Sequence, residues 1–179
     1  CLAALAVLLF IGCNDEVPPT KSAEVIAKNF IDPPLKNVDI PFTIRITSDG
    51  GTIVGGYTDS KGGDVSPQPN RDYWDLWLLK LDKCGQIQWE RSVGGTGYES
   101  ARDLVQTTDG GYLVLGETNS TDGGVVAGFG GTKDIWLLKF SANGTLEWQK
   151  RYGGSGLDIG NHIELMKDGS SLIAASSTS

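Results

Sequence analysis

The stretch DLWLLK at positions 75–80 returns 59 positions later as DIWLLK at positions 134–139. The similarity extends beyond these residues, because ten of the 23 positions from 75 to 97 are identical to their counterparts at 134 to 156. The turn Asp49-Gly50 likewise recurs as Asp109-Gly110 and as Asp168-Gly169. The chain is therefore built from tandem units with a period of 59 to 60 residues.

Each unit is predicted to form four short strands joined by tight hairpins. Asp109-Gly110-Gly111 and Ala142-Asn143-Gly144 separate neighbouring strands and provide the positive-φ positions that such hairpins require. Each unit should therefore be a β-meander. In the second unit its strands are expected at 101–107, 111–118, 134–141 and 145–152.

The third and fourth strands of a unit differ in their hydrophobic pattern. IWLLKF at 135–140 is apolar on both faces, which is typical of a strand buried between neighbouring sheets. TLEWQKRY at 145–152 alternates, as a half-buried outer strand does. This alternation places Leu146, Trp148 and Tyr152 on one side and Glu147, Gln149 and Arg151 on the other.

A four-stranded unit repeated in tandem, with tryptophan at fixed places, is the sequence signature of a β-propeller blade. The predicted fold is thus all-β, a β-propeller of four-stranded antiparallel blades of about 59 residues. The blades are expected at 42–93 and 101–152, with a partial one at 160–179. A lone blade cannot bury both faces of its apolar strands. We therefore expect the recurring tryptophans to pack between blades rather than form a sugar-stacking platform: Trp77, Trp89, Trp136 and Trp148.

Two and a half blades would form an incomplete arc. Propellers close with about four to eight blades, and an open arc would expose an apolar face and unpaired strand edges. The expectation is that the chain is a fragment of a longer protein. The alternative is an arc that closes by oligomerising.

The first residues are predicted to form a targeting signal. Residues 1–12, CLAALAVLLFIG, are apolar or small and uncharged, and they are too few to cross about 30 Å of hydrocarbon. Their length is that of the apolar region of a signal peptide, here lacking its first residues. The small Gly12 before Cys13 and the polar NDE after it resemble a bacterial lipobox, whose cysteine is lipidated. The alternative is an ordinary secretory signal.

The lipobox resemblance implies an acylated Cys13, carrying chains such as palmitate, and a linker over 13–39 that bears two Pro-Pro pairs. It also implies a bacterial cell-envelope location, anchored in the outer membrane. Asp15 and Glu16, close behind the cysteine, resemble the surface-export signals of some lipoproteins. The membrane is therefore an expected partner through the lipid anchor, and surface exposure is the further expectation.

Residues 40–179, expected to hold the propeller repeats, resemble a known family in their combined motifs: D-x-W-L-x-K, G-x(3)-W, GG-x-G and DGG-x(4)-G. These are similar to the bacterial β-propeller repeats of the SBBP type, which are common in secreted and lipid-anchored proteins. LDKCGQIQW at 81–89 is more distantly similar to the tryptophan-docking motif of quinoprotein propeller repeats. Neither resemblance implies a catalytic residue in this chain.

The sequence lacks the features of several kinds of functional site. With a formal net charge of −7 and no basic cluster, the chain is not expected to bind nucleic acid. His162 is the only histidine and has no neighbours that suggest a triad or a metal site. GGTG and GGSG match no phosphate-binding fingerprint and are predicted turns. Cys84, in DKCGQ, is expected to be a free thiol in a turn.

The acidic loops after the second strands are the candidate metal sites, and no other cofactor is expected. Calcium takes about six to eight oxygen ligands, which carboxylates among glycines could supply in part. The alternative is structural: Asp75 and Asp134 end these loops and would bind backbone amides where the next strand begins. The calcium candidates are Asp59, Asp64, Asp122 and Asp134.

These features predict a lipid-anchored cell-envelope propeller that binds or scaffolds a protein or glycan without catalysis. One alternative is a propeller enzyme, a quinoprotein-like dehydrogenase or a polysaccharide-degrading enzyme, whose catalytic residues lie outside this chain. Another is a passive spacer between the membrane and a further domain.

Overall fold

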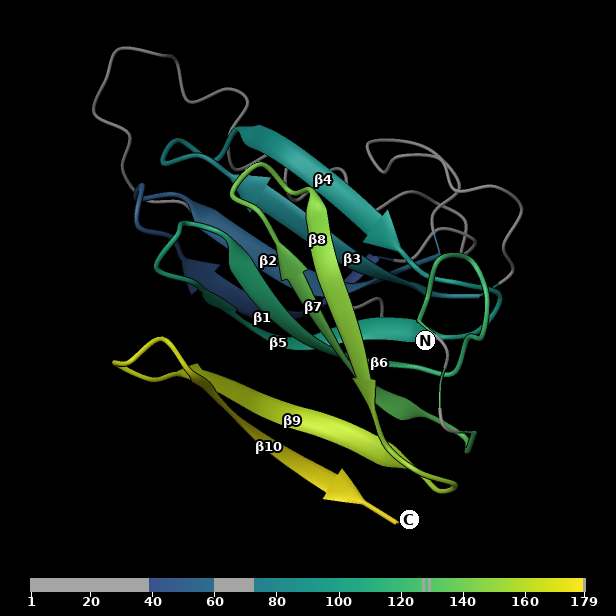
Figure 1. Ribbon diagram of the computed structural model, residues 1–179. Helices are drawn as coiled ribbons and strands as arrows, with labels where there is room; N and C mark the ends of the chain where they lie inside the picture. Colours follow the sequence, from purple (N-terminus) through teal and green to yellow (C-terminus); the bar gives the residue numbers. More distant parts are fainter. Residues whose placement is uncertain (1–38, 60–72, 127, 129, 179) are drawn as a thin grey trace.

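The computed structural model describes residues 39–59, 73–126, 128 and 130–178, and these residues are the ones discussed below. The all-β prediction is confirmed, because every regular element in this part of the chain is a β-strand (Figure 1). No helix within it is long and apolar enough to cross a membrane. The signal peptide, Cys13, the linker before position 39 and the candidate ligand Asp64 lie outside the described residues.

The strands form two four-stranded antiparallel meanders and one hairpin. Sheet 1 has the order β1-β2-β3-β4, sheet 2 has the order β5-β6-β7-β8, and β9 pairs with β10. The observed strands of the second unit agree with the predicted ones to within two residues. The bounds are β1 Asp39–Ile46, β2 Thr52–Thr58, β3 Asp75–Leu81, β4 Ile87–Val93, β5 Glu99–Gln106, β6 Tyr112–Thr118, β7 Asp134–Phe140, β8 Leu146–Tyr152, β9 Asp158–Leu165 and β10 Ser171–Ser177.

The recurring Asp-Gly pairs form the turns between the first two strands of each unit. Gly50, Gly110 and Gly169 have φ values of 79°, 81° and 84°, a region that costs other residues energy. The preceding aspartate accepts a hydrogen bond from the backbone two residues later, as in Gly111 N to Asp109 Oδ1 at 2.9 Å. The sequence repeat is thus a repeat of turn geometry.

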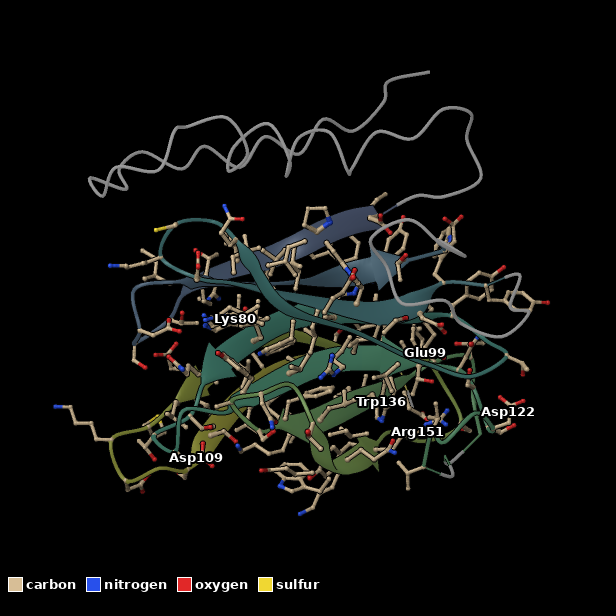
Figure 2. The ribbon with its side chains drawn as sticks, turned by 90° about the horizontal axis from the view of Figure 1, so that it is seen from above. Lys80, Glu99, Asp109, Asp122, Trp136 and Arg151 are labelled. Atoms are coloured by element: carbon tan, nitrogen blue, oxygen red, sulfur yellow. The ribbon has the colours of Figure 1, made fainter. Side chains whose placement is uncertain are left out.

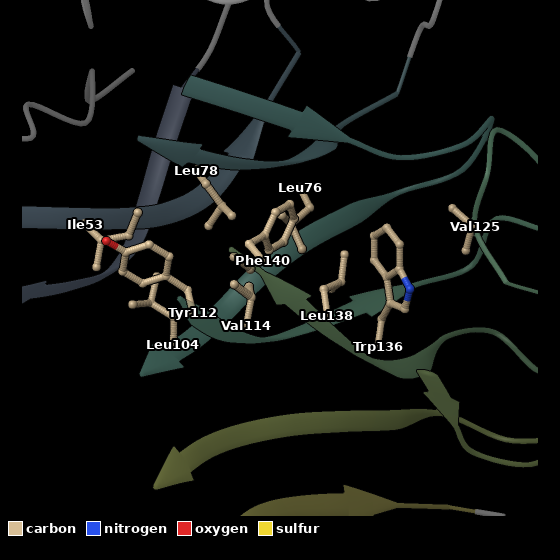
Figure 3. Packing of buried hydrophobic residues seen from close by; sticks show 11 residues of the cluster. Ile53, Leu76, Leu78, Leu104, Tyr112, Val114, Val125, Trp136, Leu138 and Phe140 are labelled. Carbon is tan, nitrogen blue, oxygen red and sulfur yellow. The ribbon is translucent and has the colours of Figure 1, made fainter. Parts of the chain in front are cut away.

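Successive sheets pack face to face with the same stagger. Strand β5 lies against β1, β2 and β3, and β9 lies against β5, β6 and β7. Small residues allow this approach: a Cβ at Gly55 would lie 2.9 Å from Leu104 Cδ2, and one at Gly160 would lie 2.6 Å from Leu115 Cδ1. A cluster of buried apolar residues fills the space between sheets 1 and 2 (Figure 3), and its members are Ile53, Leu76, Leu78, Ala101, Leu104, Tyr112, Val114, Val125, Trp136, Leu138 and Phe140.

The lysine of the recurring D-x-W-L-x-K motif ties the third strand to the first turn. Lys80 is 2% exposed, and its Nζ donates to Asp49 Oδ2 at 2.9 Å and to the carbonyl of Leu81 at 2.8 Å. Lys139 donates to Asp109 and to the carbonyl of Phe140 in the same way. Hydrogen bonds from Thr47 and then Lys80 hold the pKa of Asp49 well below its usual range. These buried ammonium groups are therefore paired.

The four recurring tryptophans occupy different environments. Trp136 is fully buried between sheets 1 and 2, and its Nε1 donates to Gln149. Trp77 is also buried and donates to Glu90 within its own sheet. Trp89 is half-buried against the cluster between the sheets, whereas Trp148 is 40% exposed.

Two details differ from the sequence-based expectation. The polar side of the last strand of unit 2 is not uniformly outward, because Arg151 is buried and ion-paired with Asp134. A guanidinium can be buried where a carboxylate and carbonyls replace its hydration. Cys84 lies in the turn between β3 and β4 as expected. It is disulfide-bonded, so the prediction that it is a free thiol is wrong.

Candidate functional site

A pocket of about 90 Å³ opens between sheets 1 and 2 and is lined by side chains from both. Its aromatic part comes from sheet 1 and the segments next to it: Phe42, Tyr57, Trp74 and Tyr98. Its polar part includes Arg102, Glu117 and Lys133. Glu99 also lines the pocket, and Figure 2 shows it at the end of the molecule that carries Asp122 and Arg151, away from the turn that carries Asp109.

The aromatic rings of the pocket form one continuous group. Tyr57 and Trp74 stack with centroids 4.5 Å apart and planes 19° apart. Phe42 meets Tyr57 edge to face at 5.5 Å, and Tyr98 meets Trp74 in the same way at 5.2 Å. Trp74 is nevertheless 41% exposed, and Phe42 and Tyr98 are also exposed. Rings that hold each other in place and still face solvent provide a rigid apolar surface.

The charged part of the pocket centres on Glu117, which is buried in β6. Its Oε1 accepts hydrogen bonds from Arg102 Nη2 at 2.9 Å and from Lys133 Nζ at 2.5 Å. Burial alone would raise the pKa of this carboxyl, but the hydrogen bonds from Lys133 and Arg102 outweigh it and the pKa is lowered. The Arg102 guanidinium also lies over the Phe42 ring, 5.2 Å from its centroid. The carboxylate therefore stays ionised and fixes two cations beside the aromatic rings.

The aromatic and charged groups occupy the same three positions of successive units. Phe42 and Arg102 are 60 residues apart. Each lies at a β-bulge in the first strand of its unit and has no paired residue on the second strand. Tyr57 and Glu117 are also 60 apart, and Trp74 and Lys133 are 59 apart. The pocket thus forms where an aromatic triplet of one unit faces the charged triplet that replaces it in the next.

Sequence reasoning missed this pocket because it concentrated on residues that recur. Of the five tryptophans, only Trp74 lacks a tryptophan partner one period along the chain, since its counterpart is Lys133. A large aromatic residue at a position that the repeat does not require was the available signal. Which aromatic and charged residues meet in the pocket could not be found without knowing the stagger between the sheets.

Three of the four predicted calcium ligands, Asp59, Asp122 and Asp134, lie in the described part of the chain. Asp134 is fully buried, and its Oδ2 accepts from Arg151 Nε at 2.6 Å. Asp122 Oδ1 accepts from the backbone N–H of Thr96 at 2.7 Å, and Asp59 lies beyond the end of β2. Among the described residues, no group of three or more His, Cys, Asp or Glu side chains is placed to hold a metal ion. Asp122 and Asp134 thus have structural partners, and those of Asp134 include a guanidinium rather than only the expected amides.

The glycine motif at 94–97 forms a turn whose backbone N–H groups are used within the chain. Each of four successive amides donates to a side-chain oxygen at 2.6 to 2.8 Å. Side chains lie so close to this backbone that a Cβ at Gly97 would be 2.1 Å from Asn119 Oδ1. The donors Gly95, Thr96, Gly97 and Tyr98 meet the acceptors Glu99, Asp122, Ser120 and Asn119, respectively.

A second polar group joins the first strands of the three units. Asp103 on β5 is buried, and its carboxylate accepts from Thr43 and Arg45 on β1. On β9, His162 Nδ1 lies 2.6 Å from Asp103 Oδ2, which also accepts from the backbone N–H of Ile163. His162 is thus a strand histidine whose ring is held by a buried carboxylate. The sequence did not predict this contact, although His162 and Asp103 are equivalent positions of the repeat.

The chain shows a partial similarity to a known protein. No family model matches the chain. Over 118 residues, or 63% of its length, the chain is 28% identical to the regulatory protein FlaEY of Caulobacter vibrioides. The chain spans only 12% of the length of that protein. The similarity therefore concerns a small part of a much longer protein.

Proposed function

We propose that this chain belongs to a lipid-anchored β-propeller of the bacterial cell envelope that serves as a non-catalytic binding module. The lipobox-like sequence at Cys13 supports the anchor, and the SBBP-like motifs support the propeller. The repeated stagger also supports the propeller, because each unit's first strand lies on the three inner strands of the unit before it. In a propeller a further sheet would lie on Trp148, as sheet 2 lies on Trp89.

The observation that carries the binding role is the pocket between sheets 1 and 2. Its aromatic rings are exposed and preorganised by one another, and its cations are fixed by a buried carboxylate. Binding sites typically combine such an apolar surface with a few oriented polar groups. Trp74 is expected to contribute most to the binding free energy, because its ring is exposed. Its counterpart in the next unit is Lys133, so packing of the repeat does not require a tryptophan at this position.

The binding role can be tested with the full-length chain and a detergent-solubilised envelope fraction of its source bacterium. The chain is immobilised, and binding is followed by interferometry. Trp74→Ala is expected to weaken binding at least about tenfold, because it removes a stacking surface. Trp148→Ala is the control, since Trp148 is equally exposed but lies outside the pocket. Equal binding by both variants, or consumption of the bound material, would contradict the proposal.

The lipid anchor makes a separate prediction. Replacing Cys13 by alanine is expected to abolish incorporation of a palmitate analogue in cells and to release the protein from the membrane fraction, because the thiol that receives the lipid is lost. Labelling is measured by gel fluorescence. Cys84→Ala should retain the label. Because the proposed processing removes Cys1 and acylates Cys13, the other two cysteines of the chain, the anchored protein is expected to carry Cys84 as a thiol and not in the disulfide of the structure. A labelled Cys13→Ala variant would rule out this anchor and leave the binding role untouched.

A further inference from the structure

We propose that the ligand of the pocket between sheets 1 and 2 is an acidic glycan, a chain that contains uronic acid residues. The sugar ring packs against the aromatic group around Trp74, and its carboxylate is bound by Arg102 and Lys133. The inference rests on the proposed binding function and names the ligand class of the same pocket.

The aromatic group favours a sugar as the apolar component. Carbohydrate rings present faces of C–H groups, which pack on the flat face of an indole or phenol ring and bury apolar area there. Trp74 is 41% exposed in spite of its contacts with Tyr57 and Tyr98, so it retains surface for such packing. Because the rings already hold each other, little rotamer freedom remains to be lost on binding.

The charged group favours a carboxylate on that sugar. The side chains of Arg102 and Lys133 are 35% and 30% exposed, whereas the side chain of Glu117 beneath them is 3% exposed. Both cations donate to the same oxygen of Glu117, so two positive charges share one carboxylate oxygen. The other pocket carboxylate, Glu99, is 1% exposed and accepts from Gly95, Thr118 and Ser120.

The pocket therefore presents positive charge to solvent above buried negative charge. A ligand meets the exposed N–H donors first, and charge-assisted hydrogen bonds to a carboxylate are the strongest interactions these donors can make. The exposed charges of the pocket are therefore positive, whereas the chain as a whole has a formal net charge of −7. The overall charge should weaken non-specific binding of acidic polymers and leave the pocket as their preferred site.

The charge requirement is tested with paired oligosaccharides that differ only in the carboxylate. Oligomers of galacturonate, glucuronate and mannuronate are compared with their methyl esters by calorimetry on the full-length chain. At least one acid is expected to bind about tenfold more tightly than its ester. Its affinity should fall when salt is raised from about 50 mM to about 500 mM. Equal affinity of every acid and its ester would overturn the acidic assignment.

Two variants locate the binding site, each with a matched control. Trp74→Ala is expected to weaken binding of the acid at least about tenfold, and Lys133→Gln about three- to tenfold with a smaller salt dependence. The controls are Trp148→Ala and Lys150→Gln, because Lys150 lies over the exposed Trp148 ring at 5.5 Å and reproduces a cation beside an indole outside the pocket. Losses in the control variants as large as those in the pocket variants would place the glycan elsewhere.

The envelope fraction separates this inference from the binding function itself. If the ligand is a glycan, Trp74-dependent binding should survive protease digestion of the fraction and be lost after periodate oxidation. Binding that is lost with protease and survives periodate would overturn the glycan and leave a binding module for protein. Absence of any Trp74-dependent binding in the untreated fraction would overturn both.

Discussion

Replacing Arg151 by methionine is expected to lower the free energy of unfolding by about 3–5 kcal/mol, because the buried Asp134 carboxylate loses the guanidinium that compensates its charge. The side chains of Arg151 and Asp134 are 4% and 0% exposed, and Arg151 Nε lies 2.6 Å from Asp134 Oδ2. The same guanidinium donates to the carbonyl of Ser120 at 2.5 Å and so holds the segment after β6. The loss should be measured by urea denaturation, with the slope compared between variants.

The double variant Asp134→Asn with Arg151→Met tests the cause of this loss. If the lost charge compensation of Asp134 dominates, removing the charge of this residue should recover much of the stability lost in the single variant. Lys150→Met is the matched control on the same strand, because Lys150 is exposed and its replacement should cost less than about 0.5 kcal/mol. A double variant as unstable as Arg151→Met would show that the hydrogen bonds to the carbonyls, rather than the ion pair, matter most.

The all-β class and the strands of each unit could be predicted because their determinants recur. The Asp-Gly turns, the apolar third strand and the lysine of the D-x-W-L-x-K motif are present in both complete units. Recurrence indicates packing and turn geometry, since every unit has the same requirements for both. Strand order within a unit follows directly, because short hairpin turns allow only antiparallel neighbours.

The candidate site was not predicted, because the prediction relied on recurring residues and the site consists of residues that do not recur. At the pocket, Trp74 corresponds to Lys133 and Tyr57 to Glu117, so each differs from its counterpart one period away. Arg151 likewise has Ser92 as its counterpart, so the repeat gave no indication of the buried ion pair between Arg151 and Asp134. These positions meet only through the stagger between sheets, a long-range property that strand patterns do not contain. In a repeat protein, the departures from the repeat are therefore the first residues to consider for function.

The stagger also explains why equivalent tryptophans need not be equally buried. Trp89 Nε1 donates to the carbonyl of Ala142 in the turn between β7 and β8, at 3.0 Å. Its ring lies directly against Gly144, where a Cβ would be 2.8 Å from the indole. Trp148 stands at the same position of the next unit, yet it is 40% exposed, and the Lys150 ammonium lies over its ring.

Trp89→Ala is accordingly expected to lower the free energy of unfolding of the 179-residue chain by about 2–4 kcal/mol, whereas Trp148→Ala should cost less than about 1 kcal/mol. The larger loss comes from the cavity left between the sheets, because the Ala142 carbonyl is exposed and can bind water in the variant. Both variants should be compared by urea denaturation under identical conditions. Equal losses would contradict the view that this tryptophan stabilises the chain by packing on the turn of the following sheet, and with it the physical basis for the proposed propeller.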